Sequence, residues 1–264
     1  MTDAAWKAFR SARDRYRAYV EDLAASVPEL RAAQQALVDG REGGSFAVET
    51  PVVYNGALDG VEKSDEIKLI LVADNPGRRE QAAENRRYLV GPSGKLADGF
   101  FRSHPELGVD FRKNVVILNK TPIHTPRTAE LAVLARAGAA VAAAIRDSQA
   151  VMAELILAFH RGLSAGSGLS AGSGLSAGSE ALPLWIIGYS ELGRGKLFEP
   201  FAAAMEAAYG AADAARLRPS VLLFRHFSMN QFSVDLRKRA TDGEPPAETL
   251  SRVGAEYRRR FFSW

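Results

Sequence analysis

Four short apolar runs, spaced widely along the 264-residue chain, constrain its fold more than any other feature. They cover residues 67–73, 114–118, 182–187 and 220–224. Three are nearly continuous hydrophobic sequences, and the run at 182–187 differs only by the proline near its start. A strand with one face in water alternates apolar and polar residues, whereas continuous runs of this length are typical of strands buried on both faces.

Segments with helical character separate these runs, at residues 95–103, 128–160 and 196–208. Alternation of buried strands and helices is typical of a parallel sheet covered by helices on both sides. We therefore predict an α/β fold, a three-layer αβα sandwich with a central four-stranded, mainly parallel sheet. Residues 46–54 are expected to add an edge strand.

Helices are also expected at both ends of the chain. Residues 1–40 are predicted to form a helical layer, because apolar residues recur there at helical spacing: Trp6, Phe9, Tyr16, Val20 and Leu23. Within this layer Pro28 begins a second helix that ends near Gly40. Two further helices, near residues 234–239 and 247–260, are expected to close the chain.

The length suits one domain of this class, and we predict that residues 1–264 form a single domain. One segment departs from the pattern, because Gly-Leu-Ser-Ala-Gly-Ser occurs three times in tandem over residues 162–179. Its residues are small and uncharged, so we expect a flexible surface loop between a helix and the third strand. None of its side chains suits catalysis.

Composition excludes several kinds of site. The chain has no cysteine, which rules out disulfides, thiolate metal sites and iron–sulfur clusters. Its four histidines are scattered and have no metal-ligand spacing: His104, His124, His160 and His226. We therefore expect no metal site and no cofactor.

Charge and hydropathy limit the expected partners. The amino terminus is charged and has no apolar signal core, and charged residues interrupt the most apolar stretch, residues 133–159. We expect a cytoplasmic protein with no membrane partner, and we expect a monomer. The net charge of +3 permits binding to nucleic acid without requiring it, since the basic clusters are also compatible with solvated helix faces.

Polar side chains follow the predicted strands at the point where each strand ends. Residues 74–77 follow the first strand, 119–122 the second and 225–228 the fourth, and each of these segments carries polar groups. The carboxyl ends of parallel strands meet at one edge of a sheet, where α/β proteins bind their ligands. The sequence therefore predicts a functional site at this edge.

Two glycine-rich segments look like nucleotide phosphate loops but lack the required pattern. Residues 91–95 lack the four-residue gap, and residues 188–195 have the gap but the wrong ending. Residues 91–95 precede a helix, so their backbone amides are compatible with one bound phosphate, or with a simple glycine-containing helix start.

Four segments resemble, in order, the motifs of the uracil-DNA glycosylase superfamily. They are Val72–Gly77 (VADNPG), Arg87–Gly94 (RYLVGPSG), Leu118–Pro122 (LNKTP) and His226–Ser228 (HFS). The resemblance spans about residues 67–235, which contain the whole predicted sheet. It implies a DNA glycosylase, which flips a deaminated base such as uracil out of the stack and hydrolyses its N-glycosidic bond in base-excision repair. The implied partner is single- or double-stranded DNA that contains a damaged base.

The resemblance also implies roles for individual residues. Asn75 matches a residue that orients the attacking water, and Asp74 matches an acidic residue that serves as a base in another branch. Which of the two acts stays open. His226 matches the histidine that donates a hydrogen bond to the leaving base, where negative charge develops in the transition state.

Other positions match groups that contact the DNA. Asn119 corresponds to the residue that reads the base through its amide, and Tyr88 or Leu89 corresponds to the residue that stacks on the base. Candidates for backbone phosphate contacts are Ser93, Lys95, Lys120 and Ser228. Candidates for an apolar wedge inserted into the stack are Phe232 and Met229.

Departures from the family motifs leave the substrate open. Ala73 replaces the leading glycine of the first motif, and Phe227 replaces the proline that follows the histidine. Gly77 stands where the most uracil-selective branch has a tyrosine. The alternatives are a non-catalytic or weakly catalytic protein that binds DNA or a damaged base, and an α/β enzyme that binds a small molecule or nucleotide.

Overall fold

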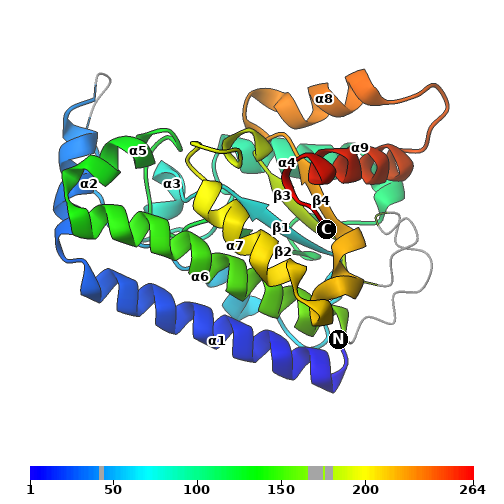
Figure 1. Ribbon diagram of the computed structural model, residues 1–264, viewed down its shortest axis with the longest axis horizontal. Helices are drawn as coiled ribbons and strands as arrows, with labels where there is room; N and C mark the ends of the chain where they lie inside the picture. The colour runs from blue at the N-terminus through cyan, green and yellow to red at the C-terminus, as the bar shows by residue number, and fades with distance from the viewer. Residues whose placement is uncertain (42–44, 166–174, 176–180) are drawn as a thin grey trace.

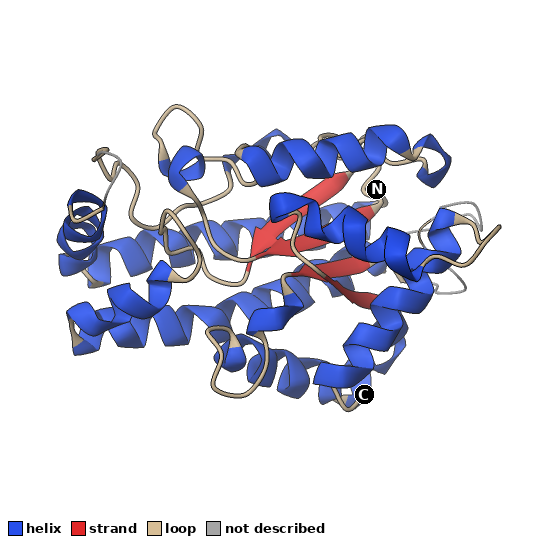
Figure 2. Cartoon of the chain, turned by 90° about the horizontal axis from the view of Figure 1, so that it is seen from above, coloured by secondary structure: helices blue, strands red, loops and turns tan. Residues whose placement is uncertain are grey.

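The computed structural model describes residues 1–41, 45–165, 175 and 181–264. At its centre lies a four-stranded, all-parallel sheet with helices on both faces, which confirms the predicted α/β sandwich (Figures 1 and 2). The strands are β1 (Leu69–Ala73), β2 (Val115–Asn119), β3 (Leu184–Ile187) and β4 (Val221–Phe224). Their order in the sheet is β2-β1-β3-β4.

Each strand coincides with one of the four apolar runs. Every residue of β1, β3 and β4 is buried, and β2 is buried apart from its first residue. The register places Ala73 beside Asn119 and Ile187 beside Phe224, so the last residues of neighbouring strands lie at one edge. The segments that follow the strands therefore meet, as the sequence predicts.

One face of the sheet is covered by α6 (Ala139–Ser164), which packs between α1 (Asp3–Ser26) and α7 (Glu199–Gly210) (Figure 1). The contact between α1 and α6 includes an edge-on packing of the rings of Phe9 and Phe159, 5.6 Å between centroids. The helix α2 (Glu29–Asp39) follows α1, so the two helices predicted in residues 1–40 are present.

The other face is covered by α4 (Pro92–Ser103), α8 (Gln231–Arg239) and α9 (Pro246–Phe261). Trp185 of β3 stacks on Phe101 of α4 and on Phe232 of α8, with ring centroids 5.7 and 5.8 Å apart. On α9, a Cβ at Gly254 would lie 2.7 Å from Leu222 Cβ, so only glycine allows this close approach of helix and strand. Short helices α3 (Arg78–Gln81) and α5 (Glu130–Leu134) lie in the connections after β1 and β2.

Two predicted elements differ from the structure. The helix expected at residues 128–160 is two helices, because a 3-10 turn and the extended Gly138 separate α5 from α6. The edge strand expected at residues 46–54 is wrong, since it forms only one antiparallel bridge, Val52 with Ile123. Side chains form hydrogen bonds with backbone groups that a neighbouring strand would otherwise bind. For example, Gln35 Oε1 accepts from the Val48 amide at 2.8 Å.

The tandem repeat lies mostly outside the described residues. Within it, residues 162–164 belong to α6 rather than to the predicted loop. Gly162 packs directly against α1, where a Cβ would lie 2.6 Å from Ala8 Cβ. Among the described residues, no helix is both long enough and apolar enough to cross a membrane.

Candidate functional site

A cavity of about 910 Å³ opens at the carboxyl edge of the sheet, and we call it the site cavity. Its walls are formed by the segments after β1, β3 and β4, by residues 125–129 and by the start of α4. The chain leaves β1 for β2 on one side and then returns to β3 on the other side of β1. The cavity therefore lies at the topological switch point, where ligands of open α/β sheets bind.

Asp74, directly after β1, lies on the wall of the site cavity and is paired with the buried Lys120. The Lys120 ammonium donates hydrogen bonds to Asp74 Oδ1 and, at 2.5 Å, to the Ile187 carbonyl, and it lies 4.8 Å from the Phe198 ring centroid. Burial lowers the pKa of Lys120, and the Asp74 carboxylate opposes this effect. Among the described residues, Asp74 Oδ2 has one weak contact, in which the Thr128 hydroxyl donates to it at 3.5 Å.

Gly188, directly after β3, makes room for the Asp74 carboxylate. Its φ of +79° favours glycine, and a Cβ there would lie 2.6 Å from Asp74 Oδ1. A side chain at this position would therefore displace the carboxylate from its place beside Lys120.

The orientation of the Asn75 amide follows from its neighbour Thr125. The Thr125 hydroxyl donates its one proton to the Arg127 carbonyl at 2.9 Å, so it must accept from Asn75. Asn75 Nδ2 is the donor in that contact, at 2.9 Å. The remaining atom, Oδ1, is an acceptor on a residue that lines the site cavity, which suits an amide that orients a water molecule.

His226, after β4, lines the same cavity and is held in one tautomer. The Ser228 backbone amide can only donate, and it lies 3.0 Å from His226 Nδ1. Nδ1 is therefore an acceptor and the neutral ring carries its proton on Nε2. Burial lowers the pKa of His226, which favours the neutral ring at neutral pH. Nε2–H has no protein acceptor among the described residues and is a donor available to a ligand.

Glu80 is a buried carboxyl group on the wall of the site cavity that the sequence analysis missed. It accepts the backbone N–H of Gly77 at 2.9 Å and that of Leu89 at 2.7 Å. It thereby ties the turn that carries Asn75 to the loop before α4. Burial raises the pKa of Glu80 to about 7, so its charge changes near neutral pH.

The site cavity brings together most of the residues that the resemblance singled out. Besides the three proposed catalytic residues, its walls include Leu89, Ser93, Ser228 and Met229. Met229 is 81% exposed and has a left-handed backbone, with φ of +50°. A large apolar side chain in this position suits a wedge better than Phe232, which is buried and stacks on Phe227 with centroids 4.2 Å apart.

Other predicted site residues lie away from the site cavity. Lys120 is fully buried against Asp74, so its ammonium does not reach a phosphate in solvent. Tyr88 is buried, and its hydroxyl bonds the Val53 carbonyl at 2.6 Å and the Tyr16 hydroxyl, so its ring belongs to the core. Lys95 is exposed on α4 and does not line the site cavity.

Asn119, at the end of β2, is 1% exposed and does not line the site cavity. Its Nδ2 is buried and has no acceptor in the described part of the chain. An unpaired buried amide of this kind costs about 1–3 kcal/mol. The amide thus retains the donor that reading a base requires, but the structure does not place it on the cavity wall.

Some sequence signals for the missed residues exist. Glu80 stands three residues after Gly77, the N-cap of α3, which is the position of a capping-box glutamate. Gly188 follows a buried strand directly, where a glycine often marks close approach of another group. No local signal points to Thr125, because its role depends on contact with a turn fifty residues earlier in the chain.

Within the described residues, no group of three or more histidine, aspartate or glutamate side chains is placed to hold a metal ion. The walls of the site cavity carry amide, carboxyl, imidazole, hydroxyl and guanidinium groups. Comparison of the chain with protein-family models and with curated proteins finds no match.

Proposed function

We propose that this protein is a DNA glycosylase that hydrolyses the N-glycosidic bond of a deaminated base such as uracil. The observation that carries the proposal is the combination of two oriented groups in one cavity at the switch point. Asn75 presents an amide oxygen that can orient water, and His226 presents an Nε2–H that can stabilise a leaving base. These are the two kinds of group that cleavage through an oxocarbenium-like transition state requires.

In the proposed reaction a water held by Asn75 attacks C1′ of a flipped nucleotide. The bond between C1′ and the base nitrogen breaks, and the bonding electrons leave with the base. His226 Nε2–H donates to a carbonyl oxygen of the base, where the negative charge gathers. Asp74 Oδ2, the carboxylate oxygen not bound by Lys120, accepts the proton that the water loses.

Charged residues at the rim support a polyanionic substrate. Arg78, Arg79 and Arg127 are exposed and line the site cavity. Ser93 lies there in the first turn of α4, a 12-residue helix whose amino end favours phosphate. Contacts of this kind position a nucleic acid without reading its sequence.

The decisive experiment uses oligonucleotides that contain a single uracil, hypoxanthine or xanthine. After incubation with the protein, alkaline scission of the strand reports abasic sites. We expect cleavage of at least one substrate, with Asn75→Ala reducing the rate strongly and Asp74→Asn deciding whether the carboxylate is needed. Binding of DNA without an abasic product on any substrate would contradict the proposal and favour a non-catalytic binding protein.

One observation favours a second candidate, an enzyme that acts on a small molecule or nucleotide. None of the described residues that line the site cavity is phenylalanine, tyrosine or tryptophan, so a flipped base would lack the usual large aromatic stacking partner. Retention on immobilised DNA at low salt, lost as salt increases, separates the two candidates, because phosphate contacts release counterions. Absence of retention would favour the small-molecule enzyme.

A further inference from the structure

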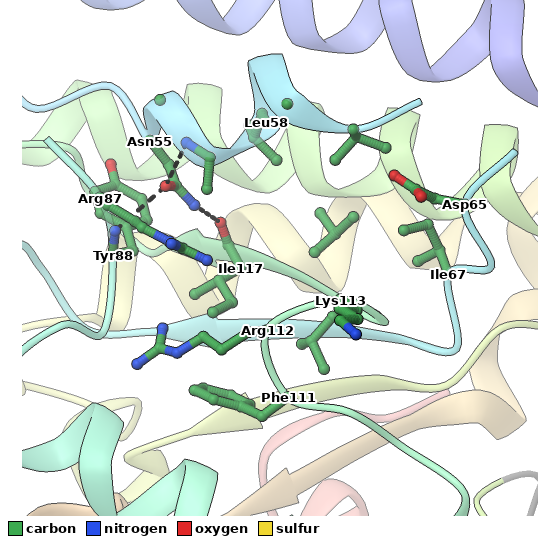
Figure 3. Close-up of a pocket in the computed structure, with 16 residues that line it drawn as sticks. Asn55, Leu58, Asp65, Ile67, Arg87, Tyr88, Phe111, Arg112, Lys113 and Ile117 are labelled. Atoms are coloured by element: carbon green, nitrogen blue, oxygen red, sulfur yellow. Dashed lines mark hydrogen bonds between the residues drawn. The ribbon is translucent and has the colours of Figure 1, made fainter. Parts of the chain in front are cut away.

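A second cavity, of about 290 Å³, lies along β2, the strand at one edge of the sheet, and we call it the edge cavity (Figure 3). The 3-10 helix η1 (Gly56–Gly60) forms one wall and β2 another. Asn55 closes part of the exposed strand edge, since its Nδ2 donates to the Ile117 carbonyl at 2.9 Å. None of the proposed catalytic residues lines it, so the edge cavity is separate from the site cavity.

Two guanidinium groups, of Arg87 and Arg112, lie at one end of the edge cavity (Figure 3). Neither forms an ion pair with a carboxylate in the described part of the chain. Burial and, second, repulsion by Arg87 lower the pKa of Arg112, and the carboxyl groups of Asp98 and Glu80 oppose this effect in part. The two like charges are therefore close enough to disfavour each other, and a bound anion would offset that cost.

The Arg112 guanidinium is held in place but is not saturated with partners. It lies 4.7 Å from the Phe111 ring centroid, and its Nη2 donates to the Leu89 carbonyl at 2.7 Å. Its Nη1 is buried and has no acceptor in the described residues. A planar guanidinium with a free N–H edge, fixed over a ring, is a preformed donor for an oxyanion.

The remaining charges of the edge cavity lie away from the two arginines. Lys113 lies on the side of Ile67 in Figure 3, its side chain is 82% exposed, and Asp110 is a distant partner at 4.0 Å. The one carboxylate that lines the cavity, Asp65, lies at the opposite end from the two arginines and accepts from the Glu62 amide (Figure 3). An anion therefore fits beside the arginines and not beside Asp65.

We propose that the edge cavity is a second binding site that takes a phosphate group between the guanidiniums of Arg87 and Arg112. A phosphate monoester carries up to two negative charges and a backbone phosphodiester carries one, and both present oxygens at the spacing that guanidiniums bind in pairs. A volume of about 290 Å³ accommodates one such group with a small substituent. The phosphate belongs either to a free phosphorylated molecule or to a nucleic-acid backbone.

The test is calorimetric titration of the full chain with inorganic phosphate at low ionic strength, where exposed charges are weakly screened. We expect Arg87→Gln and Arg112→Gln each to weaken binding about tenfold or more. Arg87 makes no hydrogen bond in the described structure, so Arg87→Gln stays informative if Arg112→Gln impairs folding. Arg86→Gln is the matched control, because Arg86 is the neighbouring exposed arginine and does not line the edge cavity.

Three results would overturn the proposal. They are no phosphate binding by the wild type, equal loss with Arg86→Gln, and loss with Arg127→Gln alone, which would place the phosphate in the site cavity. A second titration with an undamaged single-stranded oligonucleotide identifies the source. Weakening by Arg87→Gln there would identify a backbone phosphate, and unchanged oligonucleotide binding would identify a free phosphorylated molecule.

Discussion

His160 and His226 lie at opposite ends of the sheet. His160, on α6, is fully buried beside the amino ends of β3 and β4, and both ring nitrogens have partners. Nδ1 accepts from the Tyr209 hydroxyl at 2.8 Å, and Nε2 donates to the Leu182 carbonyl at 2.7 Å. His226, at the carboxyl end, satisfies only Nδ1 within the described structure and leaves Nε2–H on the wall of the site cavity.

Burial lowers the pKa of both histidines, that of His160 to about 4. A shifted pKa therefore does not separate a structural histidine from a candidate for chemistry. The difference is the unpaired donor that faces an open cavity. Neighbouring groups show a similar contrast: the Tyr209 and Ser220 hydroxyls at the amino end are both hydrogen-bonded to His160, whereas Asn119 Nδ2 at the carboxyl end has no acceptor among the described residues.

The largest effect is expected on the free energy of unfolding, for a variant at the carboxyl end of the sheet. Lys120→Met leaves the buried Asp74 carboxylate without its partner, which costs about 3–5 kcal/mol of the free energy of unfolding. Denaturant titration measures this. The double variant with Asp74→Asn should recover part of the loss, because no uncompensated charge remains. A loss below about 1 kcal/mol, typical of an exposed ion pair, would show that Lys120 is not buried in solution.

Next, His226→Ala tests the chemistry assigned to the carboxyl end. Removal of one donor to a developing anion typically lowers the rate by about 10²- to 10³-fold, and we expect that loss in glycosidic cleavage. The free energy of unfolding should fall by only about 0.5–1.5 kcal/mol, since the ring accepts one backbone hydrogen bond, from the Ser228 amide, and Nε2 has no protein partner in the described residues. Single-turnover assays and thermal unfolding give the two quantities. Cleavage at the wild-type rate would remove His226 from the mechanism.

Glu80, near the carboxyl end of the sheet, should make the free energy of unfolding depend on pH near neutrality. Burial raises the pKa of the folded carboxyl to about 7, so the folded state binds a proton more tightly than the unfolded state. This contribution stabilises the protein at low pH and is lost as pH rises toward and through 7, by about 3 kcal/mol in all. The difference in unfolding free energy between wild type and Glu80→Gln should change accordingly from pH 5 to pH 8. A constant difference would mean that Glu80 does not titrate there.

The smallest effect is expected for a variant at the amino end of the sheet, where His160 lies. His160→Leu leaves the Tyr209 hydroxyl and the Leu182 carbonyl without their partner, at a cost of about 1–3 kcal/mol. Cleavage per folded molecule should not change, in contrast with His226→Ala. Denaturant titration and the oligonucleotide assay, both at 10 °C to keep the variant folded, make the comparison. Loss of cleavage without loss of stability would reverse the roles assigned to the two histidines.

The regular parts of the fold were predictable from the sequence because their signals are local. Continuous apolar runs predicted four strands buried on both faces, and all four are present. The edge strand predicted at residues 46–54 does not form, because the side chains of Gln35 and Gln81 accept hydrogen bonds from the backbone amides of this segment. Those glutamines lie on helices outside this segment, so the strand propensity of residues 46–54 carries no information about these hydrogen bonds.

The site was predictable in outline but not in detail. The carboxyl ends of parallel strands must share an edge, so the sequence alone determined that the segments carrying Asp74 and His226 would meet. It did not determine which polar groups would be paired. Asn119 and Lys120 follow a strand directly, where the sequence predicts site residues. Lys120 instead forms a buried ion pair with Asp74, and Asn119 does not line the site cavity.

The sequence by itself therefore determined the fold class, the place of the site cavity and most residues near it. Only the tertiary structure decided the tautomer of His226, the orientation of the Asn75 amide and the burial of Glu80. The physical reason is that hydrophobic periodicity is a property of a segment. The partner of a buried polar atom is instead a property of segments that are distant in the chain and come together only on folding.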